Sequence, residues 1–423
     1  MFLISSFAYT IIFERCPVLL SEVCETLKSE WIAHLDEINA TDAIHLAKVE
    51  VNFIISEIRT LQKEISSNEK LKSLKYEAAS DFVHWEATLM SFSKQLVSMD
   101  WLESPWQLTE LYIYRRLIDI LSQTKHFSTY DPFRTLKRNN LINNLPQIRS
   151  ILEVLPESKD DIDESTLKSW FELSLWGNRC DLSHQREIEK ISDIFEDLRK
   201  LRPNILINEL DEVVDKLLVI KSSNQETIMI DIVLDNSGFE LFADLCLLDV
   251  LTIFVPKQTT IRIHVKKYPW VVSDATKRDV IWTIDLLAND QQSNELKRKA
   301  NQWHEYLQTG KWTICEHDFW TYYNSFCEMS LFANDLYQQL VKSALIIFKG
   351  DLNHLKLLSS LDWPHDTEFR IALRGFAPTF LVTLRVIKCD SITGLNYDTL
   401  AVELPKNWMI DANFALIQTA KPE

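Results

Sequence analysis

Four short apolar runs in the second half of the chain constrain its fold more than any other feature. The runs are rich in β-branched residues and lie at 228–234, 260–265, 344–348 and, less clearly, 380–387. Near-continuous apolar runs of this length are typical of strands buried on both faces of a parallel sheet. Stretches with a helical spacing of apolar residues separate them, as βαβ units require. We therefore expect an α/β domain built on a parallel sheet.

The first half of the chain shows helical patterns instead. Leu20, Val23, Leu27 and Trp31 recur at helical spacing, and residues 76–97 and 106–121 continue the pattern. A chain of 423 residues with 46% hydrophobic content is long enough for two or three domains. We expect a mainly helical N-terminal region over residues 1–200 and an α/β domain over residues 201–423.

The net charge indicates which binding partners to expect, and the cysteines indicate the redox state of the compartment. The formal net charge of −16 argues against nucleic acid and anionic membranes as partners, although an acidic surface can still hold a basic pocket for a small anion. The seven cysteines are scattered and contain no CxxC pair, which favours a reducing compartment. The apolar start ends at Glu14, too soon to span a bilayer. We expect a cytoplasmic protein with no membrane or nucleic-acid partner.

Polar clusters follow three of the expected strands. They are 235–238 (Asp-Asn-Ser-Gly), 273–274 (Ser-Asp) and 349–353 (Lys-Gly-Asp-Leu-Asn). Taken singly, each also fits an ordinary turn, a helix cap or a loop. Ligands of open α/β sheets bind at the carboxyl ends of the strands, however, so the shared position favours a site. Carboxylate and amide oxygens suit Mg²⁺ or Mn²⁺, and a lysine suits phosphate.

The glycines and several missing motifs exclude other enzyme classes. The chain has only six glycines, and no two are closer than 19 residues. This spacing rules out a GxGxxG dinucleotide loop, a Walker A loop and the usual glycine-rich loop for S-adenosylmethionine. The sequence also lacks HExxH and GxSxG, the motifs of zinc proteases and α/β-hydrolases.

Several segments together carry a resemblance to a known family. They are 176–183 (WGNRCDLS), 235–241 (DNSGFEL), 272–274 (VSD), 349–353 (KGDLN) and 385–388 (RVIK), with weaker matches at 6–9, 114–116 and 130–133. In this combination and order the chain resembles the damage-control phosphatase family, in the branch also named acidic residue methyltransferase 1-like. The last segment stands in the place of that branch's Arg-Thr-x-Lys signature. The resemblance extends over nearly the whole chain.

The resemblance implies a helical N-terminal part joined to a Rossmann-like α/β/α sandwich that binds a divalent metal. Mn²⁺ is the first choice, with Ni²⁺, Co²⁺ or Mg²⁺ as alternatives. The implied activity is a phosphatase acting on small phosphorylated metabolites, such as the sugar phosphates fructose 1-phosphate and fructose 6-phosphate. By position, the metal ligands and catalytic residues would be Asp235, Asn236 and Asp274. Substrate contacts would come from Asp235, Asn236, Lys349, Gly350, Asp351, Leu352, Asn353 and Lys388.

Two alternatives accompany this hypothesis. Glu240 and Asp274 match positions assigned to S-adenosylmethionine, which would make the chain a protein carboxyl (glutamate) O-methyltransferase. A non-catalytic binding protein is the other alternative, because Val386 replaces the signature threonine and His354 and Leu355 stand where the family has Tyr-Arg.

The remaining residues of the resemblance divide into structural residues and phosphate-binding lysines. We expect a structural role, or one behind the substrate contacts, for Trp176, Asn178, Arg179, Asp181 and Arg385. Lys349 and Lys388 each follow an apolar run. We expect both ammonium groups to emerge at the rim of the sheet and to bind the substrate phosphate.

Overall fold

The computed structural model describes residues 9–96, 98–180, 191–396 and 404–422, with no side-chain description for 178–180 and 191–193. The chain divides into two compact units. The helical unit comprises residues 1–135, 268–272 and 321–323. The sheet unit comprises residues 136–267, 273–320 and 324–423.

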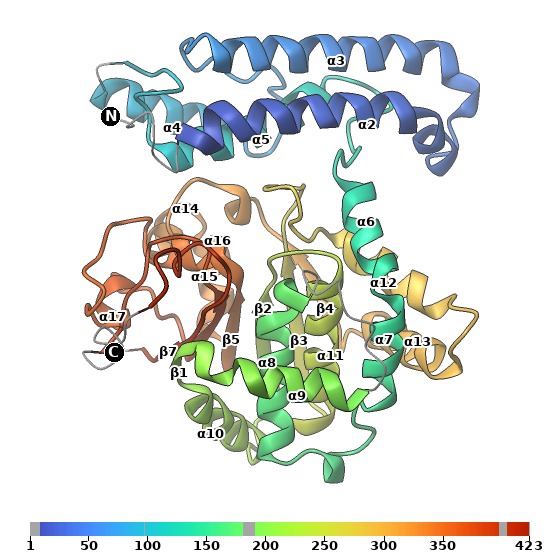
Figure 1. The fold of residues 1–423 in the computed structure, drawn as a ribbon, viewed down its shortest axis with the longest axis vertical. Coiled ribbons are helices and arrows are strands. Elements are labelled where there is room, and N and C mark those ends of the chain that lie inside the picture. The colour runs from blue at the N-terminus through green and yellow to red at the C-terminus, as the bar shows by residue number, and fades with distance from the viewer. Residues whose placement is uncertain (1–8, 97, 181–190, 397–403, 423) are drawn as a thin grey trace. The chain divides into compact units, whose positions relative to one another are not determined.

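The helical unit consists of long helices with a shared apolar core. Apolar side chains such as Leu27, Ile58 and Leu117 are almost fully buried. A buried ion pair joins Arg115 to Asp81 at 2.7 Å, and the Tyr268 hydroxyl donates to the same carboxylate at 2.7 Å. The predicted helical patterns are therefore confirmed here (Figure 1). The elements are η1 (Thr10–Arg15), α2 (Cys16–Glu37), η2 (Thr41–Ala43), α3 (Ile44–Ser66), α4 (Phe82–Gln95) and α5 (Trp106–Ser122).

A seven-stranded sheet forms the centre of the second unit. Its strand order is β1-β7-β6-β5-β2-β3-β4. The five strands from β6 to β4 run parallel, β7 is antiparallel to β6, and β1 pairs with β7 in parallel. The strands are β1 (Ile205–Asn208), β2 (Ile228–Val233), β3 (Thr259–Val265), β4 (Trp312–Glu316), β5 (Leu345–Lys349), β6 (Leu381–Val386) and β7 (Ala415–Ala420).

The predicted α/β class is confirmed, because the four apolar runs are β2, β3, β5 and β6. These four strands lie side by side among the parallel strands of the sheet. The strands β1, β4 and β7 were not predicted.

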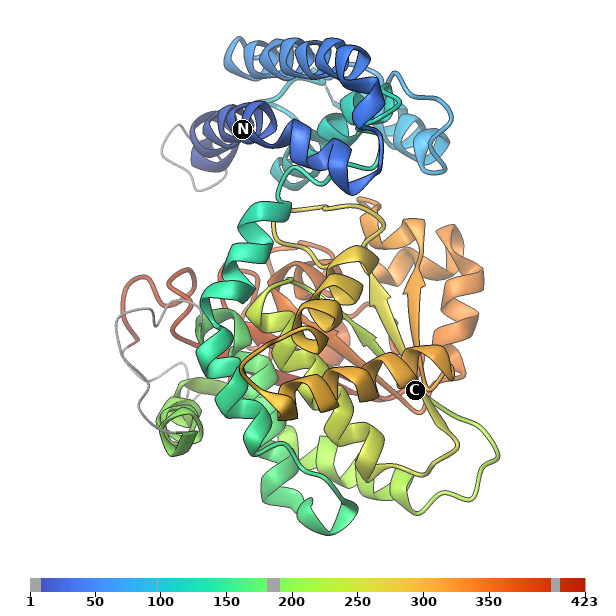
Figure 2. The same ribbon diagram turned by 90° about the vertical axis from the view of Figure 1, so that its right-hand side faces the viewer.

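Helices cover both faces of the sheet (Figures 1 and 2). The main apolar core lies between one face and the helices from α7 to α13. On the other face α16 packs on β5 and β6, and Phe348 contacts Phe326 and Phe376. The helices are α6 (Arg134–Asn143), α7 (Leu145–Glu153), α8 (Glu164–Cys180), α9 (Ile191–Leu201), α10 (Leu210–Lys221), α11 (Phe239–Phe254), α12 (Lys277–Ala288), α13 (Asn294–Gln308), α14 (Met329–Phe332), α15 (Asn334–Val341), α16 (Gly350–Leu357) and α17 (Phe369–Ala372).

The sheet unit begins at Leu136, well before the boundary expected near residue 200. The reason is packing: α8 lies against α11 and β6, so helices assigned by sequence to the N-terminal region complete the core of the sheet. Helical periodicity alone does not show against which partner a helix packs.

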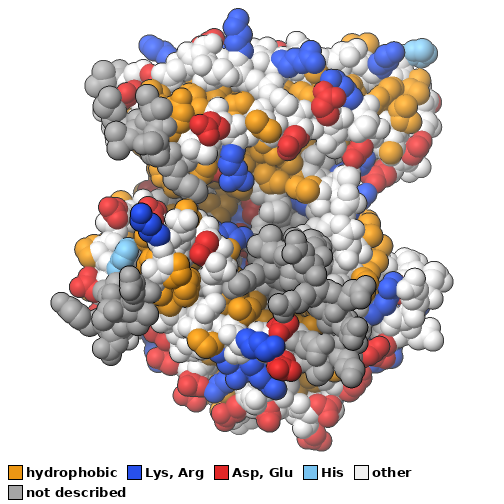
Figure 3. Space-filling model, in the orientation of Figure 1, with side chains coloured by type: hydrophobic (Ala, Val, Ile, Leu, Met, Phe, Trp, Pro, Cys, Tyr) orange, Lys and Arg blue, Asp and Glu red, His pale blue; other side chains and the backbone are white. Residues whose placement is uncertain are grey.

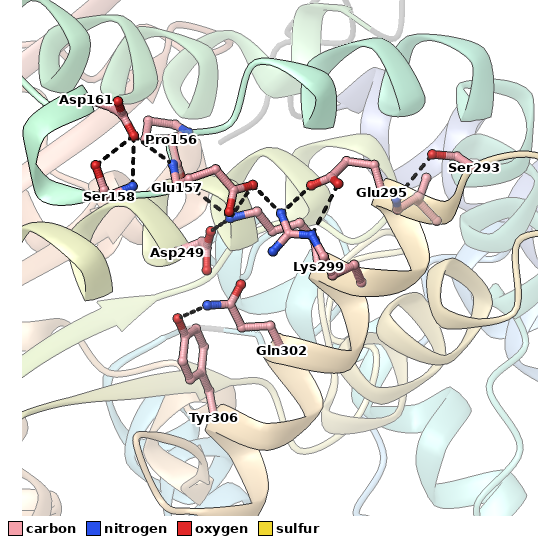
Figure 4. A network of polar contacts seen from close by, with 12 residues as sticks. Pro156, Glu157, Ser158, Asp161, Asp249, Ser293, Glu295, Lys299, Gln302 and Tyr306 are labelled. Carbon is pink, nitrogen blue, oxygen red and sulfur yellow. Dashed lines mark hydrogen bonds and ion pairs between the residues drawn. The ribbon is translucent and has the colours of Figure 1, made fainter.

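A buried lysine ties the acidic segment after α7, residues 156–161, to helices α11 and α13. Lys299 of α13 pairs with Asp249 of α11 at 3.1 Å and donates to the Pro156 carbonyl at 3.2 Å (Figure 4). Both side chains of the pair are buried. Arg298 joins the same network through Glu157 and Glu295. The segment is thus anchored to the body of the unit.

Charged side chains of both signs are intermixed over the face drawn in Figure 3. Within the described residues, no helix is long and apolar enough to cross a membrane.

The order of the strands places a topological switch point between β2 and β5. From β2 the chain passes to β3 on one side. From β5, which lies on the other side of β2, it passes to β6, farther away from β2. The connections that leave β2 and β5 therefore diverge at their carboxyl ends, which is where ligands of open α/β sheets bind. The clusters at 235–238 and 349–353 follow these two strands.

Candidate functional site

Backbone hydrogen bonds join the loops that follow β2 and β3. Ala275 N–H donates to the Asp235 carbonyl at 2.8 Å, and Ser237 N–H donates to the Ser273 carbonyl at 2.7 Å. Asn236 and Asp274 form an isolated antiparallel bridge between these contacts. The structure therefore brings the three predicted metal ligands to one place.

The Asn236 side chain is held from both ends. Its amide Nδ2 donates to Asp235 Oδ2 at 2.8 Å and to Glu240 Oε2 at 2.9 Å. The Ser273 hydroxyl donates to Asn236 Oδ1 at 2.5 Å. Glu240, in the first turn of α11, thus orients the amide.

Negative charge is concentrated around Asp235. Burial raises the pKa of the Asp235 carboxyl well above its usual range, and the carboxylates of Glu240 and Asp274 raise it further. The ammonium groups of Lys266 and Lys388 oppose this rise without cancelling it. A cation bound beside Asp235 would relieve the repulsion.

Gly350 allows the loop after β5 to approach Asp235. Its φ of +81° lies in the left-handed region, and a Cβ atom here would stand 1.9 Å from Asp235 Oδ2. Any side chain at position 350 would collide with the carboxylate.

The donor chemistry of this cluster fits a hard divalent cation. Buried carboxylate and amide oxygens with an excess of negative charge are the surroundings that Mg²⁺ or Mn²⁺ prefer. Within the described ranges, no three or more His, Cys, Asp or Glu side chains are grouped so as to hold a metal ion by themselves. The predicted set of two carboxylates and one amide, Asp235, Asn236 and Asp274, remains a prediction.

Lys349 does not emerge at the rim as expected. Its ammonium is fully buried, pairs with Asp244 Oδ1 at 2.8 Å, donates to Ser174 Oγ at 2.9 Å and lies 3.6 Å from Glu240 Oε1. The cause is the two-residue period of the strand, which places Lys349 on the same face as Leu345 and Ile347, toward α8 and α11.

The buried partners of Lys349 set its charge. Burial alone disfavours its ammonium, but Asp244 and Glu240 outweigh this effect and raise the pKa of Lys349. The pKa of Asp244 rises to about 7, because burial outweighs the attraction of Lys349. Lys349 therefore neutralises carboxylates behind the site.

Asp351 and Arg385 support the segment that carries Lys388. Arg385 Nε donates to Asp351 Oδ1 at 2.7 Å, and the Lys388 backbone N–H donates to the same oxygen at 3.3 Å. Arg385 also donates to the carbonyls of Cys389 and Ser391. This geometry accords with the structural role expected for Arg385.

Of the two lysines predicted to bind phosphate, Lys388 lines a pocket and Lys349 does not. The pocket is small, about 10 Å³, which is room for about one water molecule. No described residue pairs with the Lys388 ammonium. A phosphate group could enter only if the lining moved. The lining residues are Leu175, Asp235, Glu240, Gly350, Asp351, Leu384, Val386 and Lys388.

Asn353 holds the start of α16 rather than lining the pocket. Its Nδ2 donates to the carbonyls of Lys349 and Leu234 at 2.8 and 3.2 Å, and Lys266 Nζ donates to its Oδ1 at 3.4 Å. Leu352 is half-buried in the first turn of α16 and is not among the lining residues.

The three departures from the family pattern have different surroundings. Val386 lines the pocket, so the missing hydroxyl changes the site directly. His354 is buried in the core, stacks on Phe369 and lies with Nδ1 3.3 Å from Thr383 Oγ1. Leu355 is also buried. Neither His354 nor Leu355 lines the pocket.

The Trp176 segment is described only in part. Trp176 is fully buried in the apolar core of the sheet unit, as a structural role requires. Asn178 and Arg179 lie in the last turn of α8, without side-chain description. Asp181 lies outside the described residues.

Sequence reasoning missed residues that support the site from elsewhere in the chain. Asn140 and Lys137 of α6 contact the starts of α11 and α12. Asp244 and Lys266 lie behind the loops. One signal was available: Asp244 stands in an otherwise apolar stretch of α11, and a buried acid requires a partner.

The fold and the site define an α/β protein with a buried cluster of carboxylate and amide oxygens at the switch point of its sheet. Residues 11–400 match the family model of the damage-control phosphatase ARMT1-like domain. The chain is 34% identical over 439 residues to damage-control phosphatase ARMT1 of Danio rerio, covering 99% of this chain and 95% of that protein. The corresponding human protein is 32% identical over 409 residues, covering 93% of this chain and 90% of its own length. The chain therefore belongs to the damage-control phosphatase ARMT1-like family.

Among solved structures, a DUF89 family protein from Pyrococcus horikoshii covers 79% of this chain and 90% of its own, at 17% identity and a TM-score of 0.41.

Proposed function

We propose that this chain is a metal-dependent phosphatase that hydrolyses small phosphorylated metabolites, with sugar phosphates such as fructose 1-phosphate and fructose 6-phosphate as its substrates. The observation that carries the proposal is the oxygen cluster of Asp235, Asn236 and Asp274 at the switch point, of which Asp235 lines a small pocket together with Lys388. Family membership supports it, because the relatives are named as phosphatases. The acidic composition and the free cysteines among the described residues accord with a cytoplasmic site of action.

Asp235, Asn236 and Asp274 would hold the metal, with Mn²⁺ as the first candidate. A bound divalent cation would supply charge stabilisation to the transferred phosphoryl group. Glu240 orients the Asn236 amide through the 2.9 Å hydrogen bond, and Ser273 holds its oxygen end. We therefore assign Glu240 to positioning rather than to S-adenosylmethionine.

Lys388 would bind the phosphate oxygens as a point charge. Asp351 fixes the backbone at Lys388, and Arg385 in turn fixes Asp351. Phosphoryl transfer depends almost entirely on positioning and charge stabilisation, so this support is part of the catalytic apparatus.

The test is phosphate release from a panel of phosphorylated metabolites with Mn²⁺, Co²⁺, Ni²⁺ or Mg²⁺. Losing a metal ligand removes several kcal/mol of stabilisation, so Asp274→Asn should lower kcat/KM about a hundred-fold or more. Asp362→Asn, at an exposed aspartate, is the matched control. Wild-type protein that releases no phosphate with any of these metals refutes the proposal. Calorimetry with S-adenosylmethionine tests the methyltransferase alternative, which binding without phosphate release would favour.

A further inference from the structure

Helix α6 contacts both loops of the candidate site. Lys137 and Asn140 are three residues apart on α6, so their side chains share one face of the helix. Each reaches the start of a different helix, and each of those helices follows a loop with predicted metal ligands. Figure 1 shows α6 beside α12, and Figure 2 shows the same neighbours from the side.

Asn140 caps helix α11. The Phe239 backbone N–H donates to Asn140 Oδ1 at 2.9 Å. The residue at the N-cap of α11 is Gly238, which has no side chain with which to cap the helix itself. A Cβ atom at Gly238 would lie 2.1 Å from Asn140 Oδ1, so the glycine also makes room for the cap. The contact stands three residues after Asn236 in the chain.

Lys137 anchors the other loop through a buried ion pair. Its Nζ donates to Asp279 Oδ2 at 2.7 Å, and the Lys137 side chain is 1% exposed. The same oxygen accepts from Thr276 N–H at 2.9 Å and from Thr276 Oγ1 at 2.7 Å. The first of these bonds belongs to the capping box of α12. Thr276 follows Asp274 by two residues.

We infer that Lys137 and Asn140 are positioning residues for the metal site. They hold the loops 235–238 and 273–276 from outside, so that Asp235, Asn236 and Asp274 can share one divalent cation. This inference rests on the proposed function. Both act on the predicted ligands through the helix starts that they contact, so they are positioning residues and not catalytic ones.

If Asn140 served only to stabilise the fold, its loss would lower the global stability and leave the Mn²⁺ affinity unchanged. The positioning role predicts the reverse. The two loops are already joined to each other by the backbone bonds of Ala275 and Ser237. Loss of Asn140 should therefore leave the loops joined and free only the first turn of α11, together with Asn236 and Glu240. The expected consequence is weaker metal binding with little change in global stability.

The experiment compares Asn140→Ala, Asn140→Asp and Lys137→Met with Asn139→Ala, which removes the exposed neighbouring asparagine on the same helix. Mn²⁺ affinity is measured by calorimetry, and local opening by hydrogen exchange of peptides covering 235–242 and 274–282.

Partners behind metal ligands are typically worth about 10- to 100-fold in metal affinity, so we expect the Mn²⁺ Kd of Asn140→Ala to rise at least about ten-fold. Exchange should rise in 235–242 for Asn140→Ala and in 274–282 for Lys137→Met. Asn140→Asp keeps the acceptor oxygen and should restore both values, and Asn139→Ala should match wild type.

Wild-type Mn²⁺ affinity and exchange in both Asn140→Ala and Lys137→Met would overturn the inference. Should Lys137→Met not fold, because Asp279 is left buried without its lysine, the double variant Lys137→Met/Asp279→Asn is measured in its place. Wild-type protein that binds Mn²⁺ without releasing phosphate would refute the proposed function and leave the positioning inference intact. Wild-type protein that binds no Mn²⁺ would overturn the inference itself.

Discussion

The lysines around the site differ in the partners of their ammonium groups. Lys349 is buried against Asp244 and Ser174, and Lys266 donates to the Leu234 carbonyl at 3.3 Å and to Asn353 Oδ1 at 3.4 Å. Lys388 is half-buried beside the pocket, and no described residue pairs with its ammonium. A charge that the described residues leave without an ion-pair partner beside carboxylates is available for an anionic ligand.

Replacing Lys388 should therefore affect catalysis and not folding. A charge-assisted contact to phosphate is worth about 1.5–3 kcal/mol, so Lys388→Ala should lower kcat/KM roughly ten- to hundred-fold. The free energy of unfolding should change by less than about 0.5 kcal/mol, as at an ordinary surface position. Steady-state phosphatase kinetics and thermal unfolding on the same preparation check both values. Lys342→Ala, at an exposed lysine, is the control. Unchanged kinetics would remove Lys388 from the site, and a collapsed melting temperature would show a structural residue.

Asp244 should make the stability of the metal-free protein depend on pH. Its pKa is about 7 in the folded state, against 3.8 for an ordinary aspartate. Between these values the folded state holds a proton that the unfolded state has released, so stability falls as pH rises through this window. The slope reaches at most about 1.4 kcal/mol per pH unit.

The measurement is the free energy of unfolding of wild type minus that of Asp244→Asn, taken with a chelator from pH 5 to pH 8. The asparagine cannot titrate, so the difference isolates Asp244. We expect the difference to fall between pH 5 and pH 7 and to level off above. A difference that stays constant across this range would show that Asp244 is ionised throughout.

At the scale of elements, the central parallel strands β2, β3, β5 and β6 were readable from the sequence, and the edge strands β1 and β4 and the antiparallel strand β7 were not. β2 and β5 are near-continuous apolar runs because both faces are covered, whereas polar residues such as Arg262 and Arg385 interrupt the apolar residues of β3 and β6. β1 has only four residues, and β4, with five, lies at the other edge and carries the polar residues Thr313 and Glu316. β7 contains Gln418 and Thr419 and runs antiparallel, so it lacks the pattern of the parallel strands.

The part of the candidate site that follows recognised strands was predictable from the sequence, and the rest was not. Asp235, Asn236 and Asp274 follow strands that were recognised, and the loops do meet. Lys349 was misplaced because β5 is apolar on both faces, so alternation along the strand does not indicate which face meets α8 and α11. Lys137 and Asn140 could not be predicted, since their partners Asp279 and Phe239 are about 100 or more residues away in the chain.

The contact between α11 and α13 should depend on Lys299. The pair of Lys299 and Asp249 is fully buried, and removal of one partner from such a pair costs about 3–5 kcal/mol. Lys299→Met should therefore lower the free energy of unfolding by about this amount. Lys297→Met, a less buried lysine on the same helix, is the control and should change stability little. Denaturant unfolding of both variants checks the prediction, and equal stability of the two would contradict it.

At the scale of the whole molecule, the predicted metal ligands belong to one of the two compact units. Asp235, Asn236 and Asp274 all lie in the sheet unit, whereas the helical unit holds none of them. A ligand that binds only the folded state stabilises it by mass action. Mn²⁺ should therefore stabilise the sheet unit selectively, independently of any turnover.

The size of this effect follows from the affinity. At a Mn²⁺ concentration of about 100 times Kd the gain is about 2.7 kcal/mol, which corresponds to roughly 5–10 °C in Tm for a unit of this size. Because two compact units need not unfold together, a single melting curve does not assign the shift to one of them. Hydrogen exchange of peptides from α3 and from β2 to α11, with Mn²⁺ and with a chelator, makes the assignment. Protection should rise in the β2–α11 peptides of wild type, stay unchanged in α3, and be lost in Asp274→Asn. Equal protection of Asp274→Asn and wild type would show that Mn²⁺ binds elsewhere, and a gain confined to α3 would place the metal in the helical unit.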